Sequence, residues 1–249
     1  MSRLAAPAVE MFASVQGEGP WVGMPQLFLR LAGCDLDCLY CDTGDAHRAP
    51  AECIIHQADG DTDRLTNPLS VEDTATALNG LLSCGPQIHS LAITGGEPLL
   101  HPQFVAALAS EMSNCGLQIY LETAGHLPDA LAEVIAHVHT IAGDIKLPST
   151  MSKPVPAEQM RRFWQVARDA HCFAKIVVTD RVTVSEMQQV CGELGAAIEG
   201  LDVVLQPVTA TGPVEPPDFP LLWELAREAD KWFRSVRVIP QCHLLMGAR

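Results

Sequence analysis

Apolar segments of strand length alternate with segments of helical periodicity along most of this 249-residue chain. The predicted strands cover residues 26–31, 90–94, 117–121, 140–145, 173–179, 201–206 and 235–239. The predicted helices cover residues 70 to near 85, 102–116, 128–137, 156–170 and 184–194, and a last one carries Leu222, Leu225, Ala226 and Ala229 on one face. Strands joined by helices pair in parallel through right-handed crossovers. We therefore predict an α/β fold, and the number of units favours an incomplete, modified barrel of the TIM type.

One stretch interrupts this alternation. Residues 47–68 are polar and contain Asp-Gly-Asp and Asn-Pro, which are typical of turns. We expect a long loop or lid in this stretch, between two regular regions. The chain is expected to form a single domain over residues 1–249 that carries this lid.

The composition excludes several classes of protein. Apolar residues make up 48% of the chain, yet no apolar run reaches the roughly 18 residues that a membrane span needs. The net charge of −14 repels phosphate backbones, so a small-molecule substrate is favoured over nucleic acid. The N-terminal segment is too short and too soon interrupted for a secretory signal, so we expect a cytoplasmic protein without a membrane anchor.

Three cysteines, Cys34, Cys38 and Cys41, are spaced as C-x3-C-x2-C directly after the first predicted strand. Thiolates at this density hold metals, and three ligands on a four-iron cluster leave one iron open to a substrate or cofactor. The alternative is a structural zinc site with His47 as a fourth ligand. The other six cysteines are interpreted mostly as small apolar fillers, with Cys53 or Cys242 as an optional extra ligand.

Other chemically distinctive residues also follow strands. They are Gly95-Gly96-Glu97, Glu122-Thr123, Asp144 with Lys146, Gln206 and His243. Because the carboxyl ends of parallel barrel strands form one rim, we expect all of them to meet the cysteine loop there. Gly95-Gly96-Glu97-Pro98 alone is a weak signal for a site, since a plain turn between strand and helix would look the same. Two glycines would let a ligand approach the backbone, and Glu97 could accept from an ammonium group.

The cysteine motif and Gly95-Gly96-Glu97-Pro98 together resemble the radical S-adenosylmethionine (SAM) superfamily. The resemblance implies a [4Fe-4S] cluster on Cys34, Cys38 and Cys41 whose open iron binds the amino and carboxylate groups of SAM. It also implies that electron transfer from the cluster to SAM yields a 5′-deoxyadenosyl radical. In such enzymes the cofactor supplies the hard chemistry and the protein positions it.

Further segments are similar to the 7-carboxy-7-deazaguanine synthase family. They are Phe12–Gly19 with Gln16-Gly17-Glu18, Gly23-Met-Pro25, Phe28-Leu-Arg30, Cys41-Asp42-Thr43, Glu122–Gly125, Asp144–Ser149, Gln206-Pro207 and Pro240-Gln241-x-His243. The family resemblance implies conversion of 6-carboxy-5,6,7,8-tetrahydropterin to 7-carboxy-7-deazaguanine, with loss of ammonia, in queuosine biosynthesis. It also implies Mg²⁺, a homodimer and a flavodoxin-type reductant.

The same resemblance implies roles for individual residues. The expected substrate contacts are Gln16, Gly17, Glu18, Arg30, Thr94 and His243. The expected SAM contacts are Tyr40, Asp42, Gly95, Gly96, Glu97, Asp144, Lys146 and Gln206. Thr43 is the expected Mg²⁺ ligand, because magnesium prefers hard oxygen donors. Glu122 is either a substrate contact or a structural acceptor.

Two other functions remain open at this level. An activase that generates a glycyl radical on a partner protein shares the cysteine loop and the Gly-Gly-Glu segment, but would not need Gln16-Gly17-Glu18-Gly19. A non-catalytic iron–sulfur electron carrier or zinc module predicts no affinity for SAM. The chain also departs from the family pattern at Ala124, His126 and Leu244, which bears on peripheral substrate contacts.

Overall fold

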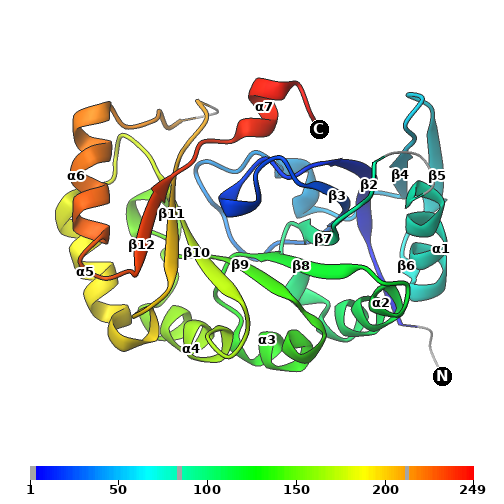
Figure 1. Cartoon of the computed structure of the whole chain (residues 1–249), viewed down its shortest axis with the longest axis horizontal. Coiled ribbons are helices and arrows are strands. Elements are labelled where there is room, and N and C mark those ends of the chain that lie inside the picture. Colours follow the sequence, from blue (N-terminus) through cyan, green and yellow to red (C-terminus); the bar gives the residue numbers. More distant parts are fainter. Residues whose placement is uncertain (1–3, 83–85, 211–212) are drawn as a thin grey trace.

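A ten-stranded, strongly curved sheet dominates the computed structural model, which describes residues 4–82, 86–210 and 213–249 (Figure 1). The strand order is β12-β11-β10-β9-β8-β7-β3-β2-β4-β5, and the strands from β3 to β12 in this order are all parallel. Within the described residues β12 and β5 have no further strand partner, so the barrel stays open. The predicted partial α/β barrel is confirmed.

The sheet strands are β2 (Ala8–Val15), β3 (Pro25–Leu31), β4 (Glu52–His56), β5 (Thr62–Thr66), β7 (Ser90–Gly95), β8 (Gln118–Thr123), β9 (Thr140–Asp144), β10 (Cys172–Val178), β11 (Asp202–Pro207) and β12 (Ser235–Val238). Two short strands, β1 (Ala5–Ala6) and β6 (Leu69–Ser70), pair separately and antiparallel. The helices are α1 (Val71–Leu82), α2 (Pro102–Asn114), α3 (Pro128–Val134), α4 (Ala157–Ala167), α5 (Val184–Leu194), α6 (Phe219–Ala229) and α7 (Cys242–Met246). Short 3-10 turns cover Gly19–Trp21, Gly44–His47, Pro98–Leu100, Ile135–His137, Pro148–Thr150 and Gly195–Ala197.

The predicted strands and helices are all present at close to the expected bounds, whereas β2 and α7 had no counterpart among them. The capping box at the start of α1 is present, because Ser70 Oγ accepts from the Asp73 amide at 3.1 Å and donates to the Asp73 carboxylate at 2.6 Å. The predicted end of that helix near Gly85 lies outside the described residues. Among the described residues, none of the helices combines the length and apolar composition that a membrane span requires.

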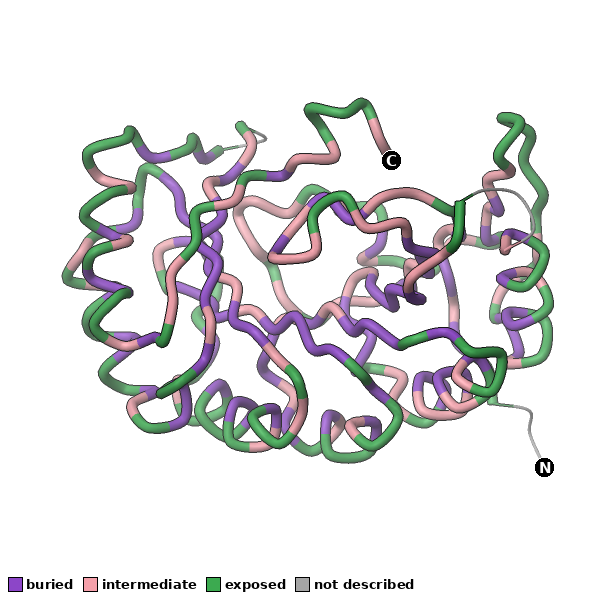
Figure 2. The backbone as a smooth tube through the Cα atoms, viewed as in Figure 1, coloured by how far each residue is buried: buried purple, intermediate pink, exposed green. Residues whose placement is uncertain are grey.

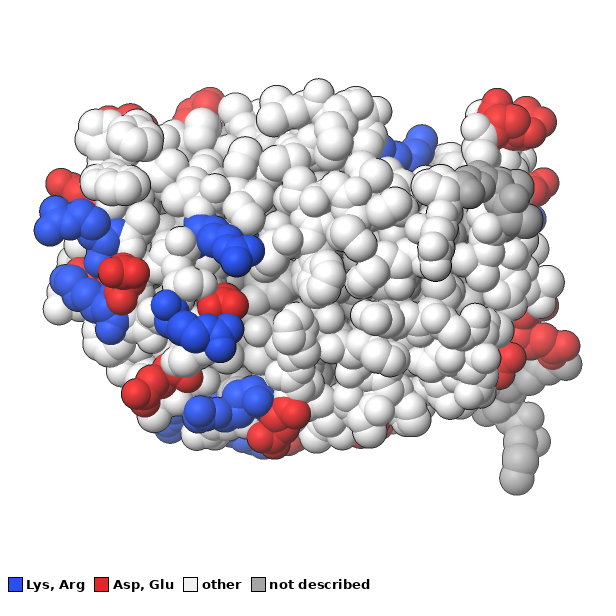
Figure 3. All heavy atoms as spheres, viewed as in Figure 1, with Lys and Arg blue, Asp and Glu red and all other residues white. Residues whose placement is uncertain are grey.

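The prediction of a loop or lid over residues 47–68 is wrong. This stretch forms the antiparallel hairpin β4–β5, and β4 extends the sheet by pairing in parallel with β2. Cys53 and Ile55 are buried, whereas β5 is an edge strand whose residues are mostly exposed. The polar composition that suggested a loop is therefore that of an edge strand. Asp59, Asp61 and Asp63 are exposed at and beside the hairpin turn, where acidic atoms gather at the upper right of Figure 3.

The core has two layers, one on each face of the curved sheet. Side chains such as Leu91 and Ile93 of β7 point outward and pack under the helices with Phe163 and Trp164 of α4. Ala92, between them, points inward, as the period-2 alternation of strands requires. The buried stretches in Figure 2 accordingly run along the strands and the sheet-facing sides of the helices.

The inner layer is small and leaves space at one end of the barrel. It contains Phe12, Phe28, Ala92, Tyr120, Ala142, Phe173 and Val204. Phe12 and Phe28 stack with their ring centroids 5.0 Å apart. These residues come from the middle or the start of their strands, so the polar side chains at the strand ends can face a cavity, which Phe12, Phe28 and Ala142 also line.

The cysteines outside the C-x3-C-x2-C motif bear out the apolar-filler interpretation only in part. Cys53 and Cys191 are buried in the outer core. Cys115 is exposed, and Cys172 and Cys242 are partly buried. Cys84 lies outside the described residues.

Asn67 fastens the hairpin to β2, and its replacement should loosen that end of the sheet. Its side chain accepts from the Ala8 amide at 3.0 Å and donates to the Ala8 and Pro50 carbonyls at 2.8 and 3.0 Å. We expect Asn67→Ala to lower the free energy of unfolding by about 1–3 kcal/mol, because these backbone groups lose their partner. Urea titration measures this. The control Asn114→Ala removes an exposed amide at the end of α2 and should change stability by under about 0.5 kcal/mol; equal effects would contradict the role of Asn67.

Candidate active site

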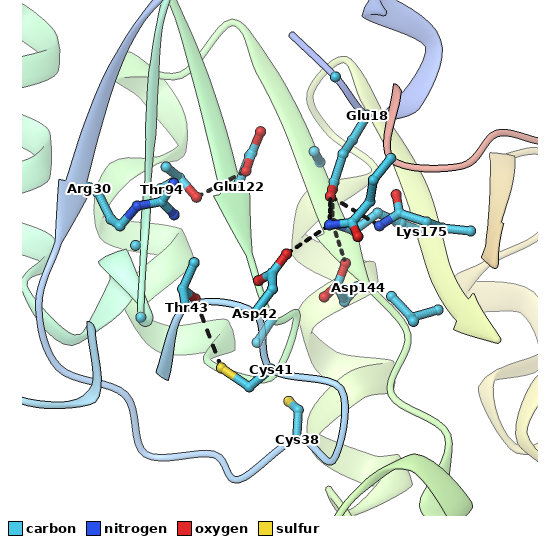
Figure 4. A pocket seen from close by; sticks show the side chains of 18 of the residues that line it. Glu18, Arg30, Cys38, Cys41, Asp42, Thr43, Thr94, Glu122, Asp144 and Lys175 are labelled. Carbon is cyan, nitrogen blue, oxygen red and sulfur yellow. Dashed lines mark hydrogen bonds and ion pairs between the residues drawn. The ribbon is translucent and has the colours of Figure 1, made fainter. Parts of the chain in front are cut away.

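A cavity of about 210 Å³ opens at the carboxyl ends of the parallel strands (Figure 4). Eighteen residues were expected as metal, cofactor or substrate contacts, and all of them line this cavity except Glu97. Glu122, which was left open, lines it as well. Residues from the cysteine loop, the strand ends and the C-terminal segment are therefore brought together as the rim argument predicted.

The cysteine loop leaves β3 and is held in place by backbone hydrogen bonds. The Gly33 amide donates to the Ala46 carbonyl at 2.7 Å, and the Leu39 amide donates to the Thr150 carbonyl at 2.9 Å. Cys34, Cys38 and Cys41 are free, partly buried thiols along one wall of the cavity. Burial raises the pKa of the Cys34 thiol to about 11 and raises that of Cys38 as well. Binding as thiolates therefore requires compensating positive charge, which iron supplies.

The thiols fit an iron–sulfur cluster better than a single zinc ion. His47 Nε2 lies 3.5 Å from Cys41 Sγ, so the proposed fourth zinc ligand is near one cysteine. In the described part of the chain, however, no three His, Cys, Asp or Glu side chains converge so that one ion could bind them all. A cluster differs in this respect, because each cysteine binds a different iron. The spread of the three thiols along one wall suits that arrangement.

Gly95 and Gly96 make room for the protein backbone, which is a role that the sequence did not predict for them. A Cβ on Gly96 would lie 2.0 Å from the Gly33 carbonyl oxygen, and one on Gly95 would lie 2.1 Å from that of Leu31. Gly95 also has φ of +142°, which side-chain-bearing residues rarely adopt. The two glycines let the end of β7 press against the start of the cysteine loop. They line the cavity as well, so a direct cofactor contact stays a prediction.

Glu97 is fully buried behind the cavity wall. Its carboxylate accepts from the Leu99 amide at 2.9 Å, the Ala124 amide at 2.7 Å and the Thr123 hydroxyl at 2.9 and 3.0 Å. Burial nevertheless raises its pKa. Glu97 thereby ties the end of β7 to the end of β8, and its predicted contact with the amino group of SAM remains a prediction from the motif.

Tyr40, Lys146 and Asp144 form a buried charge network at one end of the cavity. Lys146 Nζ donates to Asp144 Oδ2 at 2.5 Å and to the Tyr40 hydroxyl at 3.0 Å, and lies 5.3 Å from the centre of the Tyr40 ring. Burial alone would lower the pKa of Lys146, but the Asp144 charge raises it well above its usual range. Lys146 is therefore a buried cation and does not face solvent.

Glu18 is surrounded by donors from three other parts of the chain. Its Oε1 accepts from Gln206 Nε2 at 3.0 Å and Gln241 Nε2 at 2.9 Å, and its Oε2 accepts from Lys175 Nζ at 2.6 Å. Burial would raise its pKa, but Lys175 and the two amides lower it to about 2. Glu18 is thus a carboxylate at any physiological pH.

A second polar chain fixes Glu122. Its Oε1 accepts from Gln16 Nε2 and its Oε2 from the Thr94 hydroxyl, both at 2.9 Å. Gln16 Nε2 also donates to Gln26 at 2.9 Å, and Gln16 Oε1 accepts from the Glu18 amide at 3.0 Å. The side-chain amide of Gln16 therefore makes its hydrogen bonds to other protein groups. Burial raises the pKa of Glu122, whose carboxylate lines the cavity between the two predicted substrate contacts.

Arg30 lies on the opposite side of the cavity from Glu18 and Lys175 (Figure 4). Its Nε donates to Glu10 Oε1 at 2.9 Å, and Glu10 Oε2 also accepts from Arg249 Nη1 at 2.9 Å and lies 3.1 Å from His56 Nε2. Among the described residues Arg30 makes no other hydrogen bond, so its terminal nitrogens can fork onto a ligand carboxylate.

The remaining predicted contacts, Gly17, Asp42, Thr43 and His243, also line the cavity. His243 packs on Gly17, where an added Cβ would lie 2.2 Å from its Nδ1. Asp42 accepts from Gln241 Nε2 at 2.7 Å. Thr43 Oγ1 lies 3.9 Å from Cys41 Sγ, beside the cluster motif.

Of the charged and amide side chains that line the cavity, three had no role assigned from the sequence: Lys175, Gln241 and Arg249. A lysine between apolar residues in the strand Cys172–Val178 was the available signal for the first, and Gln241 stood in the quoted C-terminal motif without an assigned role. Arg249 had no sequence signal, because only the return of the C-terminal segment over β2 brings it to the cavity.

Two buried acceptors in the cavity lack hydrogen-bond donors. Asp144 Oδ1 and Gln206 Oε1 have no hydrogen-bond partner within the described residues, although Lys175 Nζ lies 3.6 Å from Asp144 Oδ1. Both belong to the set predicted to bind SAM, whose ammonium and hydroxyl groups are donors. Buried polar atoms normally form hydrogen bonds, so two acceptors without a hydrogen-bond donor fit a site for a ligand with donor groups.

Comparison with known proteins now identifies the family. The sequence profile of the radical SAM superfamily matches residues 29–191. Over 99% of both chains, the protein is 37% identical to a 7-carboxy-7-deazaguanine synthase of Geobacter sulfurreducens. The chain belongs to the 7-carboxy-7-deazaguanine synthase family of the radical SAM superfamily. A second synthase, from Methanothermobacter thermautotrophicus, is 34% identical over the full length of both chains.

Solved structures agree with this membership at the level of the fold. QueE from Escherichia coli superposes with a TM-score of 0.61 over 96% of this chain and 95% of its own, at 20% identity. A radical SAM methyltransferase from Sphaerobacter thermophilus gives a TM-score of 0.54 over 88% of this chain and 70% of its own, at 16% identity.

One departure from the usual synthase pattern has a structural partner. His126 is buried, and its Nε2 lies 3.0 Å from both carboxylate oxygens of Asp35, which stands inside the cysteine loop. This contact ties the loop to the end of β8. Nothing in the structure accounts for the departures at Ala124 and Leu244.

Replacing Gly96 should disturb the cysteine loop. We expect Gly96→Ala to lower the free energy of unfolding by at least about 2 kcal/mol, because the new methyl group collides with the Gly33 backbone. Iron binding after reconstitution should fall in parallel. Urea titration and iron analysis measure the two effects. The control Gly80→Ala lies in α1 with open space around its Cβ and should be neutral or stabilising by up to about 1 kcal/mol. A Gly96→Ala protein as stable as the control would contradict the close contact.

Proposed function

We propose that this protein converts 6-carboxy-5,6,7,8-tetrahydropterin to 7-carboxy-7-deazaguanine with loss of ammonia, as a step in queuosine biosynthesis. The observation that carries the proposal is similarity over the full chain to synthases of this name, at up to 37% identity. The cavity at the strand ends supports it, because residues from both family motifs line it. Substrate and product differ by NH₃ alone, so the net reaction consumes no electrons.

The cofactors proposed for this site are a [4Fe-4S] cluster on Cys34, Cys38 and Cys41 and SAM beside it. When bound, they supply the radical chemistry that starts the ring contraction. The chain's own part is to hold SAM in one orientation. Asp144 Oδ1 and Gln206 Oε1, which accept no hydrogen bond within the described residues, would accept from its donor groups. Tyr40, Asp42, Gly95, Gly96, Glu97 and Lys146 are assigned to the same subsite.

The substrate is proposed to lie between Arg30 and Glu18. Arg30 would bind its carboxylate with the terminal nitrogens that Glu10 leaves available. Glu18 would accept from the amino group of the pyrimidine ring, because its Oε2 has a single donor within the described residues. Gln16, Gly17, Thr94 and His243 line the space between these ends. Their fixed hydrogen bonds make this a pre-organised site.

The remaining features rest on the family resemblance. We propose Mg²⁺ bound through the Thr43 hydroxyl, which lines the cavity next to the cysteine loop. A homodimer, a flavodoxin-type reductant and a cytoplasmic location are proposed on the same basis. A single domain over residues 1–249 is supported by the sheet, whose strands come from both halves of the chain.

Turnover is the direct test. Protein purified without oxygen and reconstituted with iron and sulfide should form 7-carboxy-7-deazaguanine from carboxytetrahydropterin, given SAM, Mg²⁺ and a reductant. Product is detected by mass spectrometry, and SAM should show little net loss. Omission of Mg²⁺ should lower the rate. Cys38→Ala should lose the cluster and all turnover, whereas Cys115→Ala, an exposed cysteine at the end of α2, should retain both. Full activity of Cys38→Ala, or no product from the wild type, would overturn the proposal.

Arg30 should act on the substrate carboxylate. We expect Arg30→Ala to weaken substrate binding by about ten- to hundredfold with the cluster intact, because a charged hydrogen-bond donor is lost. Calorimetry with carboxytetrahydropterin measures this, and tetrahydropterin without the carboxylate should bind both proteins alike. Arg64→Ala, an exposed arginine that pairs with Glu52 at 3.4 Å, is the control. Unchanged affinity of Arg30→Ala would remove Arg30 from the site.

A further inference from the structure

Lys175 contacts a carboxylate of the proposed substrate subsite, Glu18, and one of the proposed SAM subsite, Asp144. It stands in β10 between Ala174 and Ile176, both fully buried in the outer core, so its own side chain points into the cavity. Figure 4 shows it between Glu18 and Asp144. Its Nζ lies 2.6 Å from Glu18 Oε2 and 3.6 Å from Asp144 Oδ1, and its side chain is 15% exposed.

Among the described residues, Lys175 is the positively charged side chain that pairs with Glu18. The titratable groups that face it are Glu18 from the segment after β2, Asp144 from β9, and Glu122 and Tyr120 from β8. The other buried cation of the cavity, Lys146, is engaged with Asp144 Oδ2 and the Tyr40 hydroxyl. Gln206 and Gln241 reach Glu18 only at Oε1 and carry no charge.

We propose that Lys175 is a positioning residue that holds Glu18 as an oriented carboxylate for the amino-pyrimidine edge of the substrate and links it to Asp144 at the cofactor end. This inference rests on the proposed function. With Oε1 held by two amides and Oε2 by Lys175, the carboxylate of Glu18 cannot rotate. The second lone pair of Oε2 then points to a defined place, which is what recognition of an amino group requires.

Charge is the second part of the role. Burial works against an ionised Glu18, and the ammonium group of Lys175 is the main opposing influence. Without it, Glu18 would take up a proton at higher pH and its protonated oxygen would no longer accept from the substrate. Removal of Lys175 should therefore make substrate binding weaken as pH falls, over a range where the wild-type Glu18, with a pKa of about 2, stays ionised.

The test compares Lys175→Met, Lys175→Arg and the control Lys231→Met by calorimetry with carboxytetrahydropterin, on cluster-loaded protein with SAM. Lys231 makes an ion pair of the same 2.6 Å length with Glu228 but is exposed, so its variant should bind like the wild type. We expect Lys175→Met to bind about ten- to hundredfold more weakly at pH 7 and Lys175→Arg within about fivefold of wild type. The ratio of variant to wild-type dissociation constants should rise between pH 8 and pH 5. The ratio removes the titration of the substrate itself.

A double-variant cycle separates positioning from general damage. If Lys175 acts through Glu18, Lys175→Met should cost under about threefold in a Glu18→Gln background. Urea titration checks that each variant is folded, and Lys175→Gln, which also removes the charge but keeps a polar side chain, replaces Lys175→Met if that variant does not fold. Wild-type affinity of Lys175→Met, or an equal loss in the Glu18→Gln background, would overturn the role of Lys175 while leaving the proposed function intact. Absence of substrate binding by the wild type would overturn both.

Discussion

The contact between the end of β7 and the start of the cysteine loop is the constraint on which the site depends. Backbone pairing continues past the two strands, because the Gly96 amide donates to the Leu31 carbonyl at 3.1 Å and the Glu97 amide donates to the Gly33 carbonyl at 2.7 Å. Only glycine at 95 and 96 permits this approach. It places three thiols over the mouth of the barrel, where the other strand ends deliver their polar side chains. Because these glycines have a structural role, the Gly95-Gly96-Glu97-Pro98 motif by itself is as typical of a tight turn as of a ligand-binding site.

Buried charge is the second organising feature. A charged side chain without a partner in this interior would destabilise the fold, because it loses its hydration. Each of the four charged residues here is paired with an opposite charge and makes further hydrogen bonds: Glu18, Asp144, Lys146 and Lys175. Such networks hold side chains in one orientation before a ligand arrives, so little reorganisation is needed on binding. Asp144 Oδ1 and Gln206 Oε1, which accept no hydrogen bond within the described residues, are the atoms of this network that can accept from a ligand.

Much of this arrangement could be predicted from the residues. Most strand and helix positions followed from hydrophobic periodicity, and all but one of the assigned residues lie in one cavity because most of them follow parallel strands whose carboxyl ends share a rim. The hairpin over residues 52–66 could not be recognised, because an exposed edge strand has the polar composition of a loop. Glu97 was expected in the cavity and lies behind its wall, since the motif does not reveal that the Thr123 and Ala124 groups claim its oxygens.

The amino-acid sequence by itself determined the class of fold, the family and the cysteines that would carry a cluster, because periodicity and motif spacing are local properties of the chain. The tertiary structure alone decided which side chains form hydrogen bonds and ion pairs with one another. Lys175 meets Glu18 across 157 positions of sequence, and Arg249 meets Glu10 across 239. Contacts of this kind depend on the curvature of the sheet and the return of the C-terminal segment over its mouth, and no local pattern encodes them.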